Sequence, residues 1–119
     1  MLPRKLRLTR TEEYRAAYDE GRARRGPALV CIACARPGEP TRAGVVASRK
    51  VGDAVRRNLA KRRLREGLRL VWPELPPVGW HLVLIATAVT VTIDYARLVD
   101  DLRSSLSELG VLAGESPLA

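Results

Sequence analysis

Apolar residues recur at helical spacing near the start of the chain. Tyr14, Ala17 and Tyr18 fall on one side of a helix, and a glycine follows shortly afterwards. Thr9 with Glu12 three residues later resembles a capping box, in which a hydroxyl and a carboxylate satisfy free N–H groups of the first helical turn. The pattern predicts a first helix that begins at Thr9 and stops before the next glycine.

Three segments have the composition of buried strands. Leu29–Ala35 is a continuous apolar run, and the proline and glycine residues of Arg36–Pro40 predict a turn after it. Ala43–Ser48 is the second predicted strand, and we expect it to pair antiparallel with the first through that turn. A third strand is predicted from His81 to Ala88, after a proline-rich loop.

Two longer segments have helical periodicity. One runs from about Asp53, a good helix cap, to Val71, and the other from residue 93 to residue 110. The predicted buried stripes are Ala60, Leu64, Leu68 and Val71 in the former, and Leu98, Leu102, Leu106 and Leu109 in the latter. The order α-β-β-α-β-α predicts an α/β (α+β) two-layer sandwich, with a small mixed sheet and three helices.

The length of 119 residues predicts a single domain over residues 1–119, with an ordered core from about residue 8 to residue 110. We expect the ends, residues 1–7 and 111–119, to be loosely held. The first residues contain no apolar signal core, and the longest apolar stretch is too short to cross a bilayer. The expected location is therefore the cytoplasm.

Positive charge is concentrated in the first part of the chain. Residues 1–69 carry 19 Lys and Arg against 7 Asp and Glu, whereas residues 70–119 carry 2 against 6. Such asymmetry is typical of a protein that binds a polyanion, because neutralised phosphates release condensed counterions. Eighteen of the 21 basic residues are Arg. The planar guanidinium suits RNA phosphates and loops, although genomic base composition would produce the same bias.

The predicted helix from Asp53 to Val71 separates a packing arc from a charged arc. Five polar residues fall within about 100° beside the apolar stripe: Asn58, Lys61, Arg62, Arg65 and Arg69. Arg56 and Arg63 lie on another side. Because few acidic residues offset the repulsion among these charges, we favour a ligand-binding face over an ordinary solvated surface.

Other candidate sites have simpler interpretations. Cys31 and Cys34 form a Cys-x-x-Cys, but residues three apart in a strand point to opposite faces, so both are expected to be buried small apolar residues rather than metal ligands. His81 has no acid or nucleophile partner in the sequence, which argues against catalysis by the protein. Asp100 and Asp101 are expected to be exposed, without a metal.

One segment also matches a specific motif, a basic pair followed by Gly-x-Ala-Val-x-Arg-Asn-x-x-Lys-Arg-x-x-Arg. Its fixed positions are Arg49-Lys50, Gly52, Ala54-Val55, Arg57-Asn58, Lys61-Arg62 and Arg65. By these residues the chain resembles the protein subunit of bacterial ribonuclease P. The resemblance extends from about Leu8 through the last predicted helix and includes a Tyr-x-x-x-Tyr where the family usually has Phe.

The resemblance implies a fold and a division of labour. The family has an α/β sandwich similar to a ribosomal-protein domain, with a left-handed β-α-β crossover. Its large RNA subunit cleaves precursor tRNA at the 5′ end of the mature sequence with bound Mg²⁺ ions, which activate water and stabilise the leaving oxygen. The resemblance implies that the protein supplies binding, with no catalytic residue or metal site of its own.

The resemblance also implies two binding surfaces. The residues expected to contact the catalytic RNA are Arg49, Lys50, Arg57, Asn58, Lys61, Arg62, Arg65 and Arg69. The single-stranded 5′ leader is expected to lie between the first helix and the exposed sheet face, against Tyr14, Tyr18 and Ser48. An alternative for the tyrosines is that they pack the helix onto the sheet. The chain has no Phe, which predicts weaker base stacking.

Two other functions fit the basic helix. One is a structural RNA-binding module of the ribosomal-protein kind, without a role in cleavage. The other is a DNA-binding regulator, but the sequence shows no helix-turn-helix partner for a recognition helix. The expected partners are therefore the catalytic RNA and precursor tRNA, with neither DNA nor a membrane.

Overall fold

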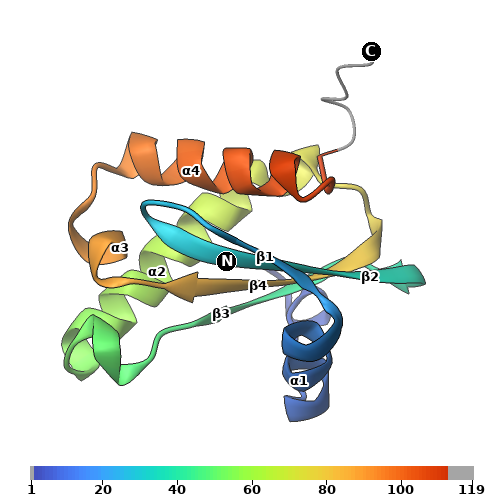
Figure 1. Ribbon diagram of the computed structural model, residues 1–119, viewed down its shortest axis with the longest axis horizontal. Coiled ribbons are helices and arrows are strands. Elements are labelled where there is room, and N and C mark those ends of the chain that lie inside the picture. The colour runs from blue at the N-terminus through green and yellow to red at the C-terminus, as the bar shows by residue number, and fades with distance from the viewer. Residues whose placement is uncertain (1, 113–119) are drawn as a thin grey trace.

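The computed structural model describes residues 2–112 and is drawn in Figure 1. Its strands are β1 (Arg22–Arg25), β2 (Leu29–Pro40), β3 (Arg42–Val46) and β4 (Val78–Ala86). Its α-helices are α1 (Thr11–Glu20), α2 (Ala54–Val71), α3 (Ala88–Thr92) and α4 (Tyr95–Glu108). Short 3₁₀ helices are η1 (Arg4–Leu6), η2 (Arg49–Val51) and η3 (Trp72–Glu74). The predicted mixed α+β fold with three long helices is confirmed, and β1 and α3 are additional elements.

The strands form one mixed sheet in the order β1-β2-β4-β3. β2 pairs antiparallel with β1 and with β4, whereas β3 pairs parallel with β4 through the crossover helix α2. The predicted antiparallel pairing of the first two strands is therefore wrong, because β4 lies between them. The β2–β4 register shifts between Arg36 and Pro40. There the chain passes the start of β4 and reaches the opposite edge of that strand, where β3 pairs.

The composition of β4 explains its central place. Leu82, Val83 and Leu84 have no exposed surface, although successive side chains of a strand point to opposite faces. A strand that is apolar on both faces is best covered when it has strands on both edges and helices above and below. β2 and β3 provide the edges, so the short connection between them does not form a hairpin.

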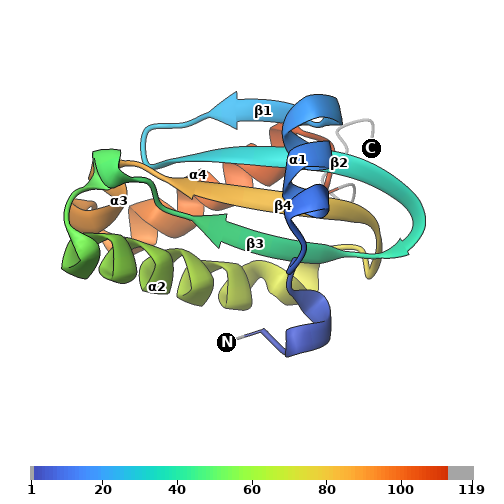
Figure 2. The same ribbon diagram turned by 90° about the horizontal axis from the view of Figure 1, so that it is seen from below.

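Helices cover the two sheet faces unequally, as Figure 1 and Figure 2 show. α2 and α4 pack on one face around the larger apolar core, whereas α1 crosses the other face over a smaller cluster. Both predicted helical stripes are confirmed as buried: Ala60, Leu64, Leu68 and Val71 of α2, and Leu98, Leu102, Leu106 and Leu109. The single helix α1 leaves part of its sheet face uncovered.

Asp101 on α4 is buried, so the expectation that it lies exposed is wrong; Asp100 is exposed as expected. Asp101 Oδ1 accepts a hydrogen bond from Arg24 Nη1 at 2.9 Å, and Oδ2 accepts one from the backbone N–H of Ala28 at 2.9 Å. These contacts fasten β1 and the β1–β2 turn to α4. The sequence interpretation missed the partner because β1, a strand rich in arginine, has no apolar pattern.

The start of α1 differs from the predicted capping box by one position. Glu13 Oε1, not the Glu12 carboxylate, accepts the backbone N–H groups of Thr9 and Arg10, each at 3.1 Å. Glu13 also forms an ion pair with Arg42 of β3. The ion pair with Arg42 on another element favours Glu13 over Glu12 as the capping residue. The local spacing of residues could not reveal this partner.

The prediction of loose ends is wrong where the structure describes them. Leu2 and Leu6 pack against the main core, Val111 is fully buried, and Leu112 is buried beside it. The N–H of Val111 donates to the carbonyl oxygen of Leu106 at 2.9 Å and so continues the end of α4. Residues 1 and 113–119, which belong to the same prediction, lie outside the described residues.

Candidate nucleic-acid interface

The basic helix starts at a defined cap. Asp53 Oδ1 accepts a hydrogen bond from the N–H of Arg56 at 3.0 Å, as its predicted capping role requires. Gly52, just before it, has a φ of +142°, which side-chain-bearing residues rarely adopt. The glycine and the aspartate of the motif therefore fix where α2 begins and how its basic residues are directed.

Four of the five residues of the charged arc predicted on α2 lie together on one surface. Asn58, Lys61, Arg62, Arg65 and Glu66 line a shallow hollow of about 390 Å³. Asn58, Arg62 and Arg69 are exposed, whereas Lys61 and Arg65 are half-buried along the edge of the apolar stripe. Arg57 is also half-buried, at the start of the helix. We call these six basic and amide residues the α2 face.

Arg63 points elsewhere and has a structural role. Its Nη1 donates to the carbonyl oxygens of Thr90 and Val91 at 2.7 and 2.9 Å, and its Nη2 donates to that of Ile93 at 2.5 Å. Arg63 therefore satisfies the hydrogen-bonding capacity of backbone carbonyl groups at the end of α3. The predicted separation of Arg63 from the α2 face is confirmed.

Ser48, Arg49 and Lys50 follow β3 and precede α2. All three are exposed, and Ser48 Oγ accepts a hydrogen bond from the N–H of Lys50 at 3.3 Å. The serine thus caps η2, and the two basic side chains project from this capped turn. This segment connects the sheet to the first turn of α2.

Side chains on the α1 side of the sheet form rows from β1 to β3. One row contains Ala23, Ile32, Val83 and Gly44. The next contains Arg25, Val30, Ile85 and Val46, and we call it the open row. The inner members of the first row are buried, whereas the three apolar members of the open row are half-exposed. α1 therefore covers the first row and leaves the open row accessible.

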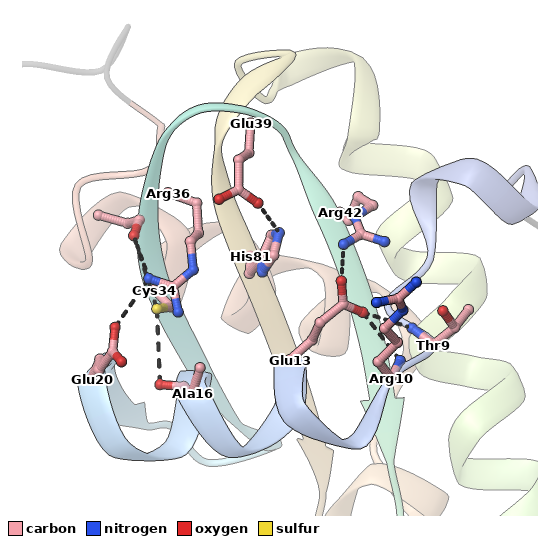
Figure 3. Close-up of polar contacts among 11 residues, drawn as sticks. Thr9, Arg10, Glu13, Ala16, Glu20, Cys34, Arg36, Glu39, Arg42 and His81 are labelled. Atoms are coloured by element: carbon pink, nitrogen blue, oxygen red, sulfur yellow. Dashed lines mark hydrogen bonds and ion pairs between the residues drawn. The ribbon is translucent and has the colours of Figure 1, made fainter.

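α1 is fixed across the strands by contacts along one flank, drawn in Figure 3. Glu13 pairs with Arg42 of β3, and Glu20 Oε1 accepts from Arg36 Nη1 of β2 at 3.0 Å. Arg36 and Arg42 lie beyond the covered row, on the side away from the open row. The opposite flank of α1, which carries the two tyrosines, faces the open row.

Tyr14 and Tyr18 occupy different environments on that flank. Tyr14 is half-buried over Gly44, and its hydroxyl donates to the carbonyl oxygen of Leu8 at 3.3 Å. Burial raises its pKa, with smaller contributions from Tyr18 and Glu13, while Arg65 of α2 opposes the shift. Tyr18 is 48% exposed. Tyr14 is thus a packing residue that also borders the surface, and Tyr18 presents its ring to solvent.

A cavity of about 420 Å³ lies beside Tyr14, at the β3 edge of the sheet. Its lining includes Arg4, Arg7, Arg65 and Tyr14, over a floor that contains Val45. Arg65 lines both this cavity and the hollow of the α2 face. The basic surface therefore extends to the N-terminal segment. The sequence interpretation missed Arg4 and Arg7 because it treated residues 1–7 as loosely held.

The remaining candidate residues have no catalytic arrangement. Cys31 and Cys34 are free thiols buried in different clusters on opposite faces of the sheet, as predicted. Burial raises the pKa of Cys31 to about 12 and disfavours its thiolate. His81 is buried, with Glu39 Oε1 at 3.5 Å from its Nε2 (Figure 3). Over residues 2–112, no three His, Cys, Asp or Glu side chains gather in a way that could hold a metal ion.

A mixed α+β fold with a basic helix beside a half-covered sheet is typical of small proteins of the nucleic-acid-binding class. The chain belongs to the ribonuclease P protein family, since the family model described as ribonuclease P matches residues 2–110. It is 35% identical over 114 residues to the ribonuclease P protein component of a Picosynechococcus species, covering 95% of this chain and 97% of the relative. Identity to the component from Gluconacetobacter diazotrophicus is 40%, covering 97% and 100%.

Solved structures agree with the fold. The RNase P protein from Thermotoga maritima superposes with a TM-score of 0.74 at 25% identity, covering 86% of this chain and 96% of that one. The Staphylococcus aureus RNase P protein gives a TM-score of 0.76 at 21% identity, covering 90% and 97%, and supports the fold alone. Family membership makes the chain an RNA-binding ribonucleoprotein subunit with a role in tRNA 5′ processing. Among the described residues, no helix is both long and apolar enough to span a bilayer.

Proposed function

We propose that this chain is the non-catalytic subunit of ribonuclease P, and that it binds the catalytic RNA and the 5′ leader of precursor tRNA on two separate surfaces. The observation that carries the proposal is that the α2 face and the open row lie close to the same edge of the sheet, the β3 edge. Tyr14 lies between them, with Gly44 of the sheet beneath it and the charge of Arg65 close enough to affect its pKa.

The α2 face and the turn before it form the surface for the catalytic RNA. The contacting residues are Arg49, Lys50, Arg57, Asn58, Lys61, Arg62, Arg65 and Arg69. Their side chains project from a capped helix and a capped turn, so the backbone that positions them loses little conformational freedom when phosphates are bound. Arginine guanidinium groups offer paired donors to phosphate oxygens, which favours a fixed orientation of the RNA.

The leader is bound along the open row, beside the flank of α1 that carries Tyr14 and Tyr18. An exposed aromatic ring stacks on an unpaired base, which is worth about 1–3 kcal/mol per base. Tyr18 supplies this ring, Tyr14 forms part of the wall, and Ser48 offers a hydroxyl beyond the end of β3. The aliphatic floor of Val30, Ile85 and Val46 accepts any base, so the sequence of the leader is read weakly.

Within residues 2–112, the side chains do not fit the requirements of a Mg²⁺ site. Mg²⁺ takes oxygen ligands in near-octahedral geometry, but Glu66, in the hollow of the α2 face, is surrounded by Lys61, Arg62 and Arg65. The ions would be held by the RNA subunit, where they would supply activation of water and stabilisation of the leaving oxygen. The protein contributes binding and orientation, with precursor tRNA as the substrate and the cytoplasm as the location.

Reconstitution with a cognate ribonuclease P RNA tests the proposal. Cleavage of precursor tRNA at physiological salt should increase when the protein is added, and the RNA-free protein should not cleave. If four to six basic groups bind phosphates, the logarithm of the assembly constant should fall against that of salt concentration with a slope of about −3 to −5. Unchanged cleavage would instead identify a structural RNA-binding module, and preference for duplex DNA over leader-bearing tRNA would identify a DNA-binding protein.

A further inference from the structure

Arg25 is the charged member of the open row. It is exposed, and its register partner on β2 is Val30. Side chains directly opposite one another in an antiparallel pair share a face, so Arg25 projects from the α1 side of the sheet at its β1 edge. Among the described residues, no hydrogen bond or ion pair holds its guanidinium.

Contacts of the neighbouring Arg24 hold the backbone of β1 in place beneath Arg25. Arg24 points to the other face, where it pairs with Asp101 at 2.9 Å and with Glu108 at 3.1 Å. These contacts hold β1 against α4, and the ladder with β2 sets the position of each residue along the strand. The backbone that carries Arg25 is therefore held on two sides, while its side chain reaches into solvent.

The open row has positive charge near both ends. It crosses four strands, so three inter-strand spacings of about 4.8 Å separate Arg25 from Val46 by about 14 Å. Beyond Val46 the chain continues to Ser48 and the exposed side chains of Arg49 and Lys50. Between the ends lie the half-exposed side chains of Val30 and Ile85. An apolar floor with cations at its two ends is complementary to a single strand of nucleic acid, whose bases have aromatic faces and whose backbone is anionic.

We infer that Arg25 binds a phosphate of the leader where the RNA leaves the sheet across β1. This inference rests on the proposed leader-binding function and names a residue that the family motif does not include. A leader that enters the open row at β3, the end next to the surface proposed for the catalytic RNA, reaches Arg25 only after crossing the whole row. The contact therefore belongs to the distal part of the leader and discriminates by leader length rather than by base sequence.

The aliphatic floor increases the importance of this phosphate contact. Valine and isoleucine exclude water from a base but provide no ring on which it can stack. Stacking is then confined to α1, and the strand needs another contact to hold it across β2 and β1. Each phosphate contact adds about one to the slope of log affinity against log salt, and at physiological salt its loss weakens binding by about threefold to tenfold.

The test uses the reconstituted holoenzyme and precursor tRNAs that differ only in leader length. Arg25→Ala should weaken binding of long-leader substrates by about threefold to tenfold and reduce the salt slope by about one. Short-leader substrates and mature tRNA should bind as they do to the wild type. Arg25→Lys should restore part of the affinity, because a point charge still attracts phosphate.

Arg22→Ala is the matched control. Arg22 lies on the same strand and is also exposed, but its register partner Ala33 belongs to the opposite face. The two variants lose the same charge, so a difference between them reports the position of that charge. Equal losses from Arg22→Ala and Arg25→Ala, or an Arg25→Ala loss independent of leader length, would overturn the inference.

Tyr18→Ala separates this inference from the proposed function. If Tyr18→Ala reduces the preference for precursor over mature tRNA while Arg25→Ala has no effect, the leader binds on α1 and the inference about Arg25 fails alone. If the wild-type protein gives no preference for precursor at any leader length, the leader-binding function fails as well. Thermal melting of each variant establishes that the fold is retained.

Discussion

The ring of Tyr14 lies directly on Gly44. The two are so close that a methyl group at residue 44 would overlap the tyrosine hydroxyl and the ring carbon that bears it. Glycine at this point of β3 lets α1 approach the sheet closely. The same contact places the tyrosine-bearing flank of α1 beside the open row. The position of a strand glycine thus determines how the proposed leader surface is shaped.

Gly44→Ala is expected to displace Tyr14 and to destabilise the protein by about 1–3 kcal/mol, as overpacking does in a close-packed interior. The preference for precursor over mature tRNA should fall with it, whereas affinity for the catalytic RNA should change little. Urea unfolding and filter binding measure the two effects. Gly38 of β2 has open space around it but a φ of +83°, so Gly38→Ala should also destabilise the protein, through backbone strain, while leaving the precursor preference unchanged. Unaltered stability of Gly44→Ala would contradict the packing role.

Gly67→Ala is expected to have the opposite effect on stability. Gly67 lies inside α2, and an added methyl group would meet Leu102 and Val99 of α4 at 3.8 Å, an ordinary packing distance. Alanine favours a helix interior over glycine by about 1 kcal/mol, so the melting temperature should rise by about 4 °C. Calorimetry checks the shift. Gly52→Ala, at a φ of +142°, should lower the melting temperature, and the same sign for both variants would be inconsistent with this account.

The basic helix was predictable because local information specifies it. A cap at Asp53 and a periodic apolar stripe ending at Val71 fix its limits and its packing side. The motif identified the family, and helical periodicity separated Arg63 from the α2 face. Each of these inferences uses neighbours along a single helix.

The sheet was harder to predict because its order depends on residues far apart in the chain. Nothing near residues 36–40 indicates that β4, about forty residues later, lies between β2 and β3. β1 escaped notice because its stability comes from the ladder to β2 and from Asp101, a residue 77 positions from Arg24. The open row could therefore not be assembled from the sequence, although two tyrosines that border it could be chosen.

Arg62→Ala and Tyr18→Ala should have separable effects if the two surfaces are distinct. Arg62, on the exposed part of the α2 face, should contribute to assembly with the catalytic RNA, so its loss should weaken assembly and flatten the salt dependence. Arg57→Ala should behave in the same way. Tyr18→Ala should spare assembly and reduce the preference for precursor by about 1–3 kcal/mol. Titrations of holoenzyme assembly and substrate binding measure these quantities, and equal losses in both assays from both variants would refute the two-surface arrangement.

His81 is expected to make stability depend on pH in a defined range. Burial lowers its pKa below the ordinary value of 6.5, Arg42 lowers it further, and Glu39 and Glu13 oppose the shift. Because the folded state holds His81 neutral, the unfolded state binds more protons below pH 6.5, and stability is lost as pH falls from 6.5 toward the folded pKa.

The slope in that range should reach at most about 1.4 kcal/mol per pH unit for this one group. Urea unfolding of the wild type and of His81→Gln, on both sides of pH 6.5, measures it. The variant should show a flatter profile there, even if it is less stable throughout. Glu13, whose pKa lies below its ordinary 4.5 because hydrogen bonds from Arg10, Thr9 and Arg42 outweigh its burial, loses its contribution only in more acidic solution. An unchanged slope between the two proteins near pH 6 would show that the imidazole accepts a proton without leaving its place in the fold.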